Sequence, residues 1–299
     1  MLPNFLVIGA AKSGTTSLYH YLAQHPEIYM SPVKEPRFFA LEGHPLDFPG
    51  PGGHWVRAET RTTLDGYERL FDGVRGERAV GEASVIYLIH PRAAEAIAAR
   101  IPDARLVAVL RDPAERAYSA FLDQSLAGYE TCETFEAALA AEPQRVADGW
   151  YWWWHYREHG YYHRHLSRYY ERFDPEQIRV YLYEDYAGDP HAVLADMFGF
   201  LGVDDGFRVD VATRHNRSGR ARSPRVQALL GYPHPAKEAL KKVVPERFGH
   251  RVISMLLEKN LEREPMRPET RAELVAGYAE DIGRLEGLIG RDLSTWLHA

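Results

Sequence analysis

The sequence of 299 residues contains a single cysteine, Cys132. One cysteine cannot form an intramolecular disulfide, which excludes a disulfide-stapled fold and favours an intracellular protein. The surroundings of Cys132 show no pattern that would activate a thiolate, so it is a poor candidate for a nucleophile. The 14 histidines lack the spacing of a metal-ligand set, and we expect no metal site.

Long apolar runs and an excess of basic residues are also missing. No stretch approaches the ~18 apolar residues that span a bilayer, and the start of the chain lacks the basic and small-residue pattern of a signal peptide. These absences predict a soluble, cytoplasmic protein without a membrane partner. The net charge of −6 argues against a nucleic-acid partner, although a local cluster of Lys and Arg would still bind an anion.

Short apolar runs alternate with helical patterns along the chain. The apolar runs predict strands at residues 5–8, 105–110 and 178–183, with another short strand from residue 79. Helices are predicted from the first loop to His25, over 91–100, from Pro113, over 189–201 and over 268–290. The Gly- and Pro-rich residues 43–57 predict a surface loop. This alternation predicts an α/β fold: a single domain over residues 1–299 with a central, mainly parallel sheet flanked by helices.

A glycine-containing loop over residues 9–17 joins the first predicted strand to the first helix. Such loops bind phosphate because backbone N–H groups point outward and the helix dipole favours negative charge. Gly9 and Gly14 allow the backbone to approach a ligand closely, and Lys12 adds a mobile positive charge. Further hydrogen-bond donors come from Ser13, Thr15, Thr16 and Ser17.

This loop differs from the P-loop of kinases and ATPases. That motif has Lys directly after its second Gly, where this sequence has Thr15. The strand at 105–110 ends in Arg111-Asp112 rather than in a lone Asp that would hold Mg²⁺. We therefore expect a nucleotide that is bound without a metal. A P-loop nucleotide kinase or NTPase acting on a small molecule, and a non-catalytic nucleotide-binding protein, are the alternatives.

Two segments resemble the donor-binding segments of sulfotransferases that use PAPS (3′-phosphoadenosine-5′-phosphosulfate). Residues 11–17 resemble the loop that holds the 5′-phosphosulfate, and residues 110–119 resemble the segment that holds the 3′-phosphate. The sequence is most similar to the heparan-sulfate branch and its bacterial relatives, with further similarity at residues 34–39, 81–84, 183–186 and 290–296.

The resemblance implies a P-loop-like sulfotransferase fold. It also implies transfer of a sulfuryl group from PAPS to a hydroxyl of a small-molecule or carbohydrate acceptor, with PAP as the product and no metal. A role in secondary metabolism would suit a small acceptor, and an amine acceptor also fits the motifs. The oligomeric state does not follow from the resemblance.

The resemblance also implies which residues hold the donor. Lys12 and residues 13–17 would hold the 5′-phosphate, while Arg111 and Ser119 would hold the 3′-phosphate. The planar guanidinium of Arg111 suits a phosphate, and it follows a strand, where ligands of open α/β sheets collect. The alternative is that Arg111 forms a structural ion pair with Glu115, although Arg116 suits that structural role better.

A basic loop over residues 212–224 corresponds to the segment that closes over the nucleotide in the resembling family. Arg217 and Ser218 are therefore candidate donor-binding residues. The alternative is a solvated basic loop without a ligand.

The predicted general base is Glu35. In the heparan-sulfate branch a glutamate before a Phe pair acts as the base, and residues 34–39 match that pattern. A carboxylate beside apolar rings can have a raised pKa, which suits base catalysis. The alternative is an ion pair with Lys34 or Arg37. Some heparan-type enzymes carry His and Asp where this sequence has Arg37 and Ala40, which argues against carrying over the glycosaminoglycan substrate.

Three residues are candidate acceptor contacts. Arg37 would bind an anionic acceptor, and Glu82 and Ser84 follow a predicted strand on the acceptor side. The alternative for Glu82 is a buried structural ion pair. The aromatic residues 150–156 would either line the acceptor pocket or fill the core.

Overall fold

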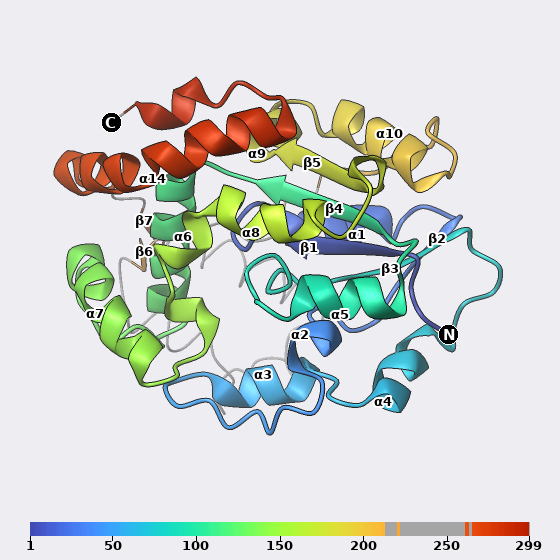
Figure 1. Cartoon of the computed structure of the whole chain (residues 1–299), viewed down its shortest axis with the longest axis horizontal. Coiled ribbons are helices and arrows are strands. Elements are labelled where there is room, and N and C mark those ends of the chain that lie inside the picture. The colour runs from blue at the N-terminus through green and yellow to red at the C-terminus, as the bar shows by residue number, and fades with distance from the viewer. Residues whose placement is uncertain (213–219, 222–260, 263–264, 299) are drawn as a thin grey trace, which may run out of the picture.

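The computed structural model describes residues 1–212, 220–221, 261–262 and 265–298. They form a single α/β domain in which a central sheet lies between layers of helices (Figure 1). The sheet is parallel throughout, with the strand order β2-β3-β1-β4-β5. Its strands are β1 (Phe5–Gly9), β2 (Ile28–Met30), β3 (Ala79–Ala83), β4 (Arg105–Leu110) and β5 (Ile178–Leu182). The predicted α/β fold with a parallel sheet is confirmed.

The remaining elements surround this sheet. A separate antiparallel pair consists of β6 (Arg220–Ala221) and β7 (Leu261–Glu262). The α-helices of the described residues are α1 (Thr15–Leu22), α2 (Phe38–Leu41), α3 (Gly53–Glu59), α4 (Leu64–Glu68), α5 (Ala93–Arg100), α6 (Pro113–Leu126), α7 (Phe135–Ala147), α8 (Tyr162–Tyr170), α9 (Tyr183–Gly188), α10 (Pro190–Leu201) and α14 (Pro268–Ile289). Short 3-10 turns are η1 (Arg69–Phe71), η2 (Trp152–Trp154), η3 (Glu158–Gly160), η4 (Pro175–Gln177) and η5 (Ser294–Leu297).

The central strands are apolar because both faces of the sheet are covered. On β1, Phe5 and Val7 belong to the core that α1 and α10 cover. Leu6 and Ile8 point the other way, into the larger core under α5, α8 and α14. Figure 1 views the sheet from the side of α5 and α8. Residues buried on both faces give the continuous apolar runs from which these strands were predicted.

Capping residues explain where two predicted helices begin. At the start of α6, Asp112 Oδ1 accepts hydrogen bonds from the main-chain N–H groups of Ala114 (2.9 Å) and Glu115 (3.1 Å). At the start of α10, Asp189 accepts from the N–H of Ala192 at 3.0 Å. In both helices a proline follows the cap, where its fixed backbone suits the first turn.

Three local predictions are wrong. Residues 43–57 are not a continuous loop, because α3 begins at Gly53, after Gly52 turns the chain with φ 79°. The last strand ends at Leu182, and Tyr183 begins α9. The first helix ends at Leu22 rather than reaching His25. Within the described part of the chain, no helix is both long and apolar enough to cross a bilayer.

Candidate active site

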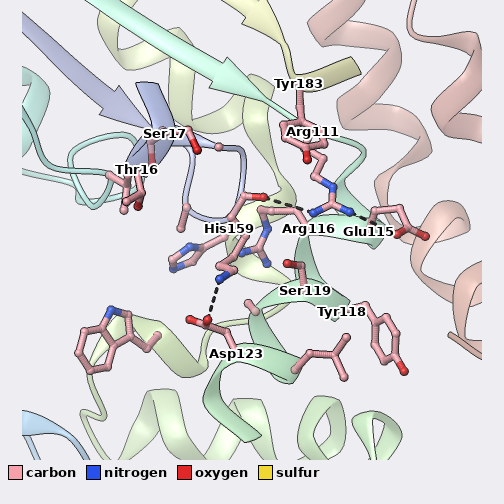
Figure 2. A pocket seen from close by; sticks show the side chains of 18 of the residues that line it. Thr16, Ser17, Arg111, Glu115, Arg116, Tyr118, Ser119, Asp123, His159 and Tyr183 are labelled. Carbon is pink, nitrogen blue, oxygen red and sulfur yellow. Dashed lines mark hydrogen bonds and ion pairs between the residues drawn. The ribbon is translucent and has the colours of Figure 1, made fainter. Parts of the chain in front are cut away.

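The carboxyl ends of β1, β3 and β4 lie at the same edge of the sheet because these strands are parallel neighbours. The loop after β1 carries Lys12, and β4 is followed by Arg111. Arg111 Nη1 donates a hydrogen bond to the main-chain oxygen of Lys12 at 3.4 Å. Both residues line one cavity of about 1420 Å³. Figure 2 shows Arg111 among the residues around this cavity. The two segments predicted to bind the donor therefore meet in one cavity.

The loop between β1 and α1 has a backbone shape that requires glycine at one position. Gly14, at the start of α1, has φ 83°, in the left-handed region. A Cβ placed there would lie 3.0 Å from the ring of Tyr186 and 3.3 Å from that of Tyr183. This loop and the start of α1 contribute six residues to the lining of the cavity: Ala11, Lys12, Gly14, Thr15, Thr16 and Ser17. Ser13 belongs to the same loop but is buried, and its Oγ has no hydrogen-bond partner among the described residues.

One face of α6 presents a row of polar side chains to the cavity. Glu115, Ser119 and Asp123 follow one another at intervals of four residues and therefore share a face of the helix. Figure 2 shows them along the helix below Arg111. Asp123 Oδ1 lies 2.8 Å from Lys12 Nζ, and Glu115 Oε2 lies 3.5 Å from Arg111 Nη2. Lys12 and Arg111 thus each have a carboxylate partner on α6. The Arg111–Glu115 pair is the one that the sequence analysis gave as the alternative interpretation.

Glu35 lines the same cavity and is held in place by main-chain groups. Its N–H donates to the carbonyl of Ala83 at 2.9 Å, and its carboxylate oxygens accept from the N–H of Val85 at 3.3 and 3.2 Å. Ion pairs join the carboxylate to Lys34 (3.0 Å) and to Arg37 (3.7 Å). These contacts fix the direction in which the Glu35 carboxylate points.

Arg37 is nearly enclosed by protein, with an exposed fraction of 2%. Its Nη2 lies 2.9 Å from Glu59 Oε2, and its Nη1 donates to Thr60 Oγ1 at 3.4 Å. Its main-chain N–H donates to Ser84 Oγ at 3.0 Å. The guanidinium of Arg37 is therefore already engaged by the carboxylates of Glu35 and Glu59.

Glu82 and Ser84 are fully buried and are not among the residues that line the cavity. Ser84 Oγ donates to Glu82 Oε2 at 2.9 Å, and the Tyr67 hydroxyl donates to Glu82 Oε1 at 3.1 Å. Burial raises the pKa of Glu82 to about 7, although hydrogen bonds from Tyr87 and Ser84 act in the opposite direction. The structure places this pair behind segment 34–37 rather than at the cavity wall.

Arg116 and His159 also line the cavity (Figure 2). Arg116 is buried and donates from Nη2 to the main-chain oxygen of Tyr156. Burial, and then the charge of Arg116, lower the pKa of His159 well below its ordinary value. His159 is therefore neutral at pH 7 and adds no charge to the cavity.

Some lining residues were missed by the sequence analysis: Asp123, Gln124, Tyr129, His159, Tyr183, Tyr186 and Arg271. Asp123 could have been found, because it lies one helical turn after Ser119 on a predicted helix. Tyr183 and Tyr186 belong to a segment whose similarity was noted without assigning it a role. His159 and Arg271 reach the cavity only through tertiary packing, for which no local signal exists.

The aromatic segment 150–156 divides between the two predicted roles. Trp153 lines the cavity. Tyr151, Trp154 and Tyr156 are buried and belong to the main hydrophobic core. The core role therefore holds for these three residues, while a role of Trp153 in acceptor binding stays a prediction.

Three further predictions concern the basic loop, a metal site and the single cysteine. Arg217 and Ser218 lie outside the described residues. In the described ranges, no group of three or more His, Cys, Asp or Glu side chains could hold a metal ion. Burial and the nearby Glu130 raise the pKa of the Cys132 thiol, which disfavours a thiolate nucleophile.

Comparison with known proteins gives consistent matches. A family model described as "Sulfotransferase family" matches residues 3–206. The crystal structure of a sulfotransferase from Alicyclobacillus acidocaldarius is 37% identical, covers all of both chains and has a TM-score of 0.80.

Curated relatives match over part of their length. Human heparan sulfate glucosamine 3-O-sulfotransferase 3B1 is 28% identical over 202 residues, covering 68% of this chain and 46% of that protein. The bifunctional heparan sulfate N-deacetylase/N-sulfotransferase 1 of Caenorhabditis briggsae is 27% identical over 223 residues, covering 68% of this chain and 23% of that protein. The chain thus spans less than half the length of these relatives.

Proposed function

Because the chain belongs to the sulfotransferase family, we propose that it transfers a sulfuryl group from PAPS to a hydroxyl of a small-molecule or carbohydrate acceptor and releases PAP. The observation that carries this proposal is the meeting of Lys12 and Arg111 in one cavity. A cytoplasmic location and a role in secondary metabolism remain predictions from the sequence.

The residues of the cavity suit a nucleotide with anionic groups at two separate positions. Lys12 and the N-terminal end of α1 supply positive charge and donors for a 5′-phosphate. Arg111 supplies positive charge for a 3′-phosphate, and both Arg111 and Ser119 supply hydrogen-bond donors for it. Gly14 lines the cavity and has no side chain, which supports a close approach of a ligand to the backbone of this loop.

In the proposed reaction, an oxygen of the acceptor attacks the sulfur atom of the donor. The bond between sulfur and the bridging phosphate oxygen breaks, and that oxygen keeps the electron pair in PAP. Lys12 stabilises the charge that develops on the leaving phosphate. The proton of the acceptor hydroxyl passes to the carboxylate of Glu35. As in phosphoryl transfer, catalysis rests mainly on positioning and electrostatic stabilisation.

The contacts around Glu35 support a division of roles in segment 34–37. Glu35 reaches the cavity, while Arg37 is enclosed and pairs with Glu35 and Glu59. We therefore assign Arg37 to positioning the base rather than to binding an anionic acceptor. Burial supports a similar positioning role for Glu82 and Ser84, since Ser84 accepts a hydrogen bond from the N–H of Arg37.

The proposed function is tested by donor binding and turnover in buffer containing EDTA. PAP should raise the melting temperature, because a ligand that binds only the native state stabilises it. Labelled PAPS should also be consumed with an acceptor panel. Turnover of ATP with Mg²⁺ and no effect of PAP would favour a kinase or NTPase. Binding of PAP without any PAPS turnover would favour a non-catalytic protein.

A further inference from the structure

The carboxylate of Glu115 joins two arginines that come from distant parts of the chain. Its Oε2 lies 3.5 Å from Arg111 Nη2, and its Oε1 lies 3.4 Å from Arg271 Nη1. Arg111 follows β4, whereas Arg271 lies in α14. Building on the proposed function, we infer that Arg271 is a second guanidinium ligand of the donor's 3′-phosphate, and that the Glu115 carboxylate occupies the position of this phosphate until the donor binds.

All three side chains are accessible from the cavity. Arg111, Glu115 and Arg271 line it, and so do Pro265 and Met266 just before α14. The beginning of the C-terminal helix therefore reaches the same cavity as the segment after β4. The side chains of the two arginines are each 21% exposed, and that of Glu115 is 45% exposed. The carboxylate is thus the most accessible member of this group, and it can move without uncovering a buried charge.

Arg271 is anchored so that one nitrogen of its guanidinium is directed at Glu115. Its Nη2 lies 2.7 Å from Asp112 Oδ2, and its Nε donates to the main-chain oxygen of His298 at 3.1 Å. Asp112 is itself held in place, because its Oδ1 caps the start of α6. These contacts leave Nη1 as the nitrogen that faces Glu115. The guanidinium is therefore positioned before a ligand binds, which lowers the entropy cost of binding.

Arg111 is anchored in a similar way. Its Cζ lies 5.0 Å from the centre of the Tyr183 ring, within the range of a cation–π contact, and its Nη1 donates to the main-chain oxygen of Lys12. Its Nη2 is the nitrogen that faces Glu115. Each arginine thus offers one nitrogen to the same carboxylate. Because a guanidinium matches phosphate as well as carboxylate geometry, a phosphate in that position would accept hydrogen bonds from both arginines.

The position of Glu115 coincides with the proposed 3′-phosphate subsite. Ser119, which we expect to bind this phosphate, follows Glu115 by one turn and lies on the same face of α6. Figure 2 shows Glu115 and Ser119 along this helix, next to Arg111. A phosphate held by Arg111 and Ser119 is therefore adjacent to the position of the Glu115 carboxylate. Arg271 Nη1 already contacts that carboxylate and is within reach of the phosphate.

The relative strength of the contacts favours the phosphate over Glu115. Partly exposed ion pairs contribute little, and the two pairs of Glu115 are long. A phosphate forms shorter, charge-assisted hydrogen bonds with arginine, and it brings a charge of about −1.5 to −2 at neutral pH. The donor should therefore displace Glu115 from both arginines. Since Glu115 competes for the same nitrogens, it should weaken the binding of nucleotides that carry a 3′-phosphate and leave other nucleotides unaffected.

The test measures the contribution of the 3′-phosphate in each variant. Calorimetric titration gives the dissociation constants of PAP and of AMP, and their ratio cancels any change that affects both nucleotides. We expect Arg271→Ala to lower the preference for PAP by about tenfold or more, the usual effect of a hydrogen bond to a charged group. Glu115→Gln should raise the preference by about two- to fivefold, in keeping with a partly exposed ion pair. Arg271→Gln, which keeps a hydrogen-bond donor for Asp112, should show the same loss if Arg271→Ala does not fold.

A double variant distinguishes direct contact with the phosphate from an effect through Glu115. If Arg271 binds the phosphate, adding Arg271→Ala to Glu115→Gln should still lower the preference for PAP by about tenfold. If Arg271 only holds Glu115 in place, the double variant should have the same preference as Glu115→Gln. The second result would overturn the inference.

The controls keep this inference separate from the proposed function. Arg284→Ala removes an exposed cation from the same helix and should leave the preference for PAP unchanged. An unchanged preference in the Arg271 variants, or a lower one in Glu115→Gln, would overturn the inference, although the wild type would still bind PAP and consume PAPS. A wild type that neither binds PAP nor consumes PAPS would instead overturn the proposed function.

Discussion

Arg111 donates a hydrogen bond from Nη1 to the main-chain oxygen of Lys12, although 99 positions separate the two residues in the sequence. The contact exists because β1 and β4 are neighbouring parallel strands, so the segments that follow them emerge side by side. A ligand that reaches Lys12 can therefore also reach Arg111. The predictions below follow from this arrangement and from the residues around it.

Replacing the proposed base should separate catalysis from donor binding. We expect Glu35→Gln to lower kcat by about 10²–10⁴-fold, the usual contribution of a positioned base. The PAP dissociation constant should stay within about twofold, because Glu35 faces the acceptor side. Glu42→Gln, which removes a carboxylate paired with Arg100 outside the cavity, is the control. Full activity of Glu35→Gln would show that another group takes the proton.

The buried carboxyl of Glu82 should make stability depend on pH. Burial raises its pKa from 4.5 to about 7, so the folded protein holds this proton more tightly than the unfolded chain. Its contribution is therefore fully present below about pH 4.5 and is lost as the pH rises through 7. Between pH 5 and 8, the free energy of unfolding of the wild type should fall relative to Glu82→Gln by at most about 3 kcal/mol.

The test compares the free energy of unfolding of the wild type with that of Glu82→Gln at each pH, because other groups change the stability of both proteins. Burial lowers the pKa values of His90, His155 and His165 to about 4. These histidines act in the opposite direction, because the unfolded chain binds their protons more tightly. Urea unfolding at several pH values gives the difference directly. A constant difference from pH 5 to 8 would contradict a raised pKa for Glu82.

A methyl group on Gly14 should disturb the donor loop. Gly14→Ala combines left-handed backbone strain, which costs about 1–2 kcal/mol, with contact to the Tyr186 ring at 3.0 Å. Gly43→Ala is a matched control, since its φ is 71° but a Cβ there would meet nothing within 4 Å. We expect Gly14→Ala to be the more destabilised in urea unfolding and to be the one that loses PAP affinity. If Gly14→Ala and Gly43→Ala lowered the free energy of unfolding equally and Gly14→Ala kept its PAP affinity, the loop would not be tightly packed.

Arg271 should link the C-terminal helix to the donor site. It lies on α14 and pairs with Asp112 at 2.7 Å and with Glu115 at 3.4 Å. Arg271→Ala should lower the free energy of unfolding by about 1–3 kcal/mol, because it leaves two partly buried carboxylates without this cation. Arg284→Ala, on the same helix, removes an exposed pair with Glu280 and should cost only about 0.3–0.5 kcal/mol. Equal losses of unfolding free energy in Arg271→Ala and Arg284→Ala, measured by urea unfolding, would contradict a stabilising link between α14 and the donor site.

The sequence was sufficient to predict the elements that carry strong local signals. The strand at Arg105–Leu110 is a continuous apolar run, and α6 begins at a capping Asp followed by Pro. The helix α3 was missed because its only buried residue is Val56, so it has no apolar stripe. The end of β5 was misplaced because Tyr183 fits a strand as well as the start of a helix.

The same distinction applies to the candidate site. Lys12 and Arg111 could be found because each lies in the segment after a predicted parallel strand. Ligands of open α/β sheets bind at the carboxyl ends of such strands. The burial of Arg37 and Glu82 could not be read from their neighbours in sequence, since it depends on Thr60, Tyr67 and other residues brought in by the fold. The pairing of Lys12 with Asp123 likewise requires α6 to pack beside the first loop.

The central claim is that Lys12 and Arg111 hold two ends of one nucleotide. Calorimetric titration of PAP and of AMP, which lacks the 3′-phosphate, tests it most directly in the wild type, Lys12→Ala and Arg111→Ala. The wild type should bind PAP much more tightly than AMP; Arg111→Ala should lose most of that preference, by about 10–100-fold, while Lys12→Ala should weaken both nucleotides. A preference for PAP that survives in Arg111→Ala, or a wild type that binds neither nucleotide, would contradict the account.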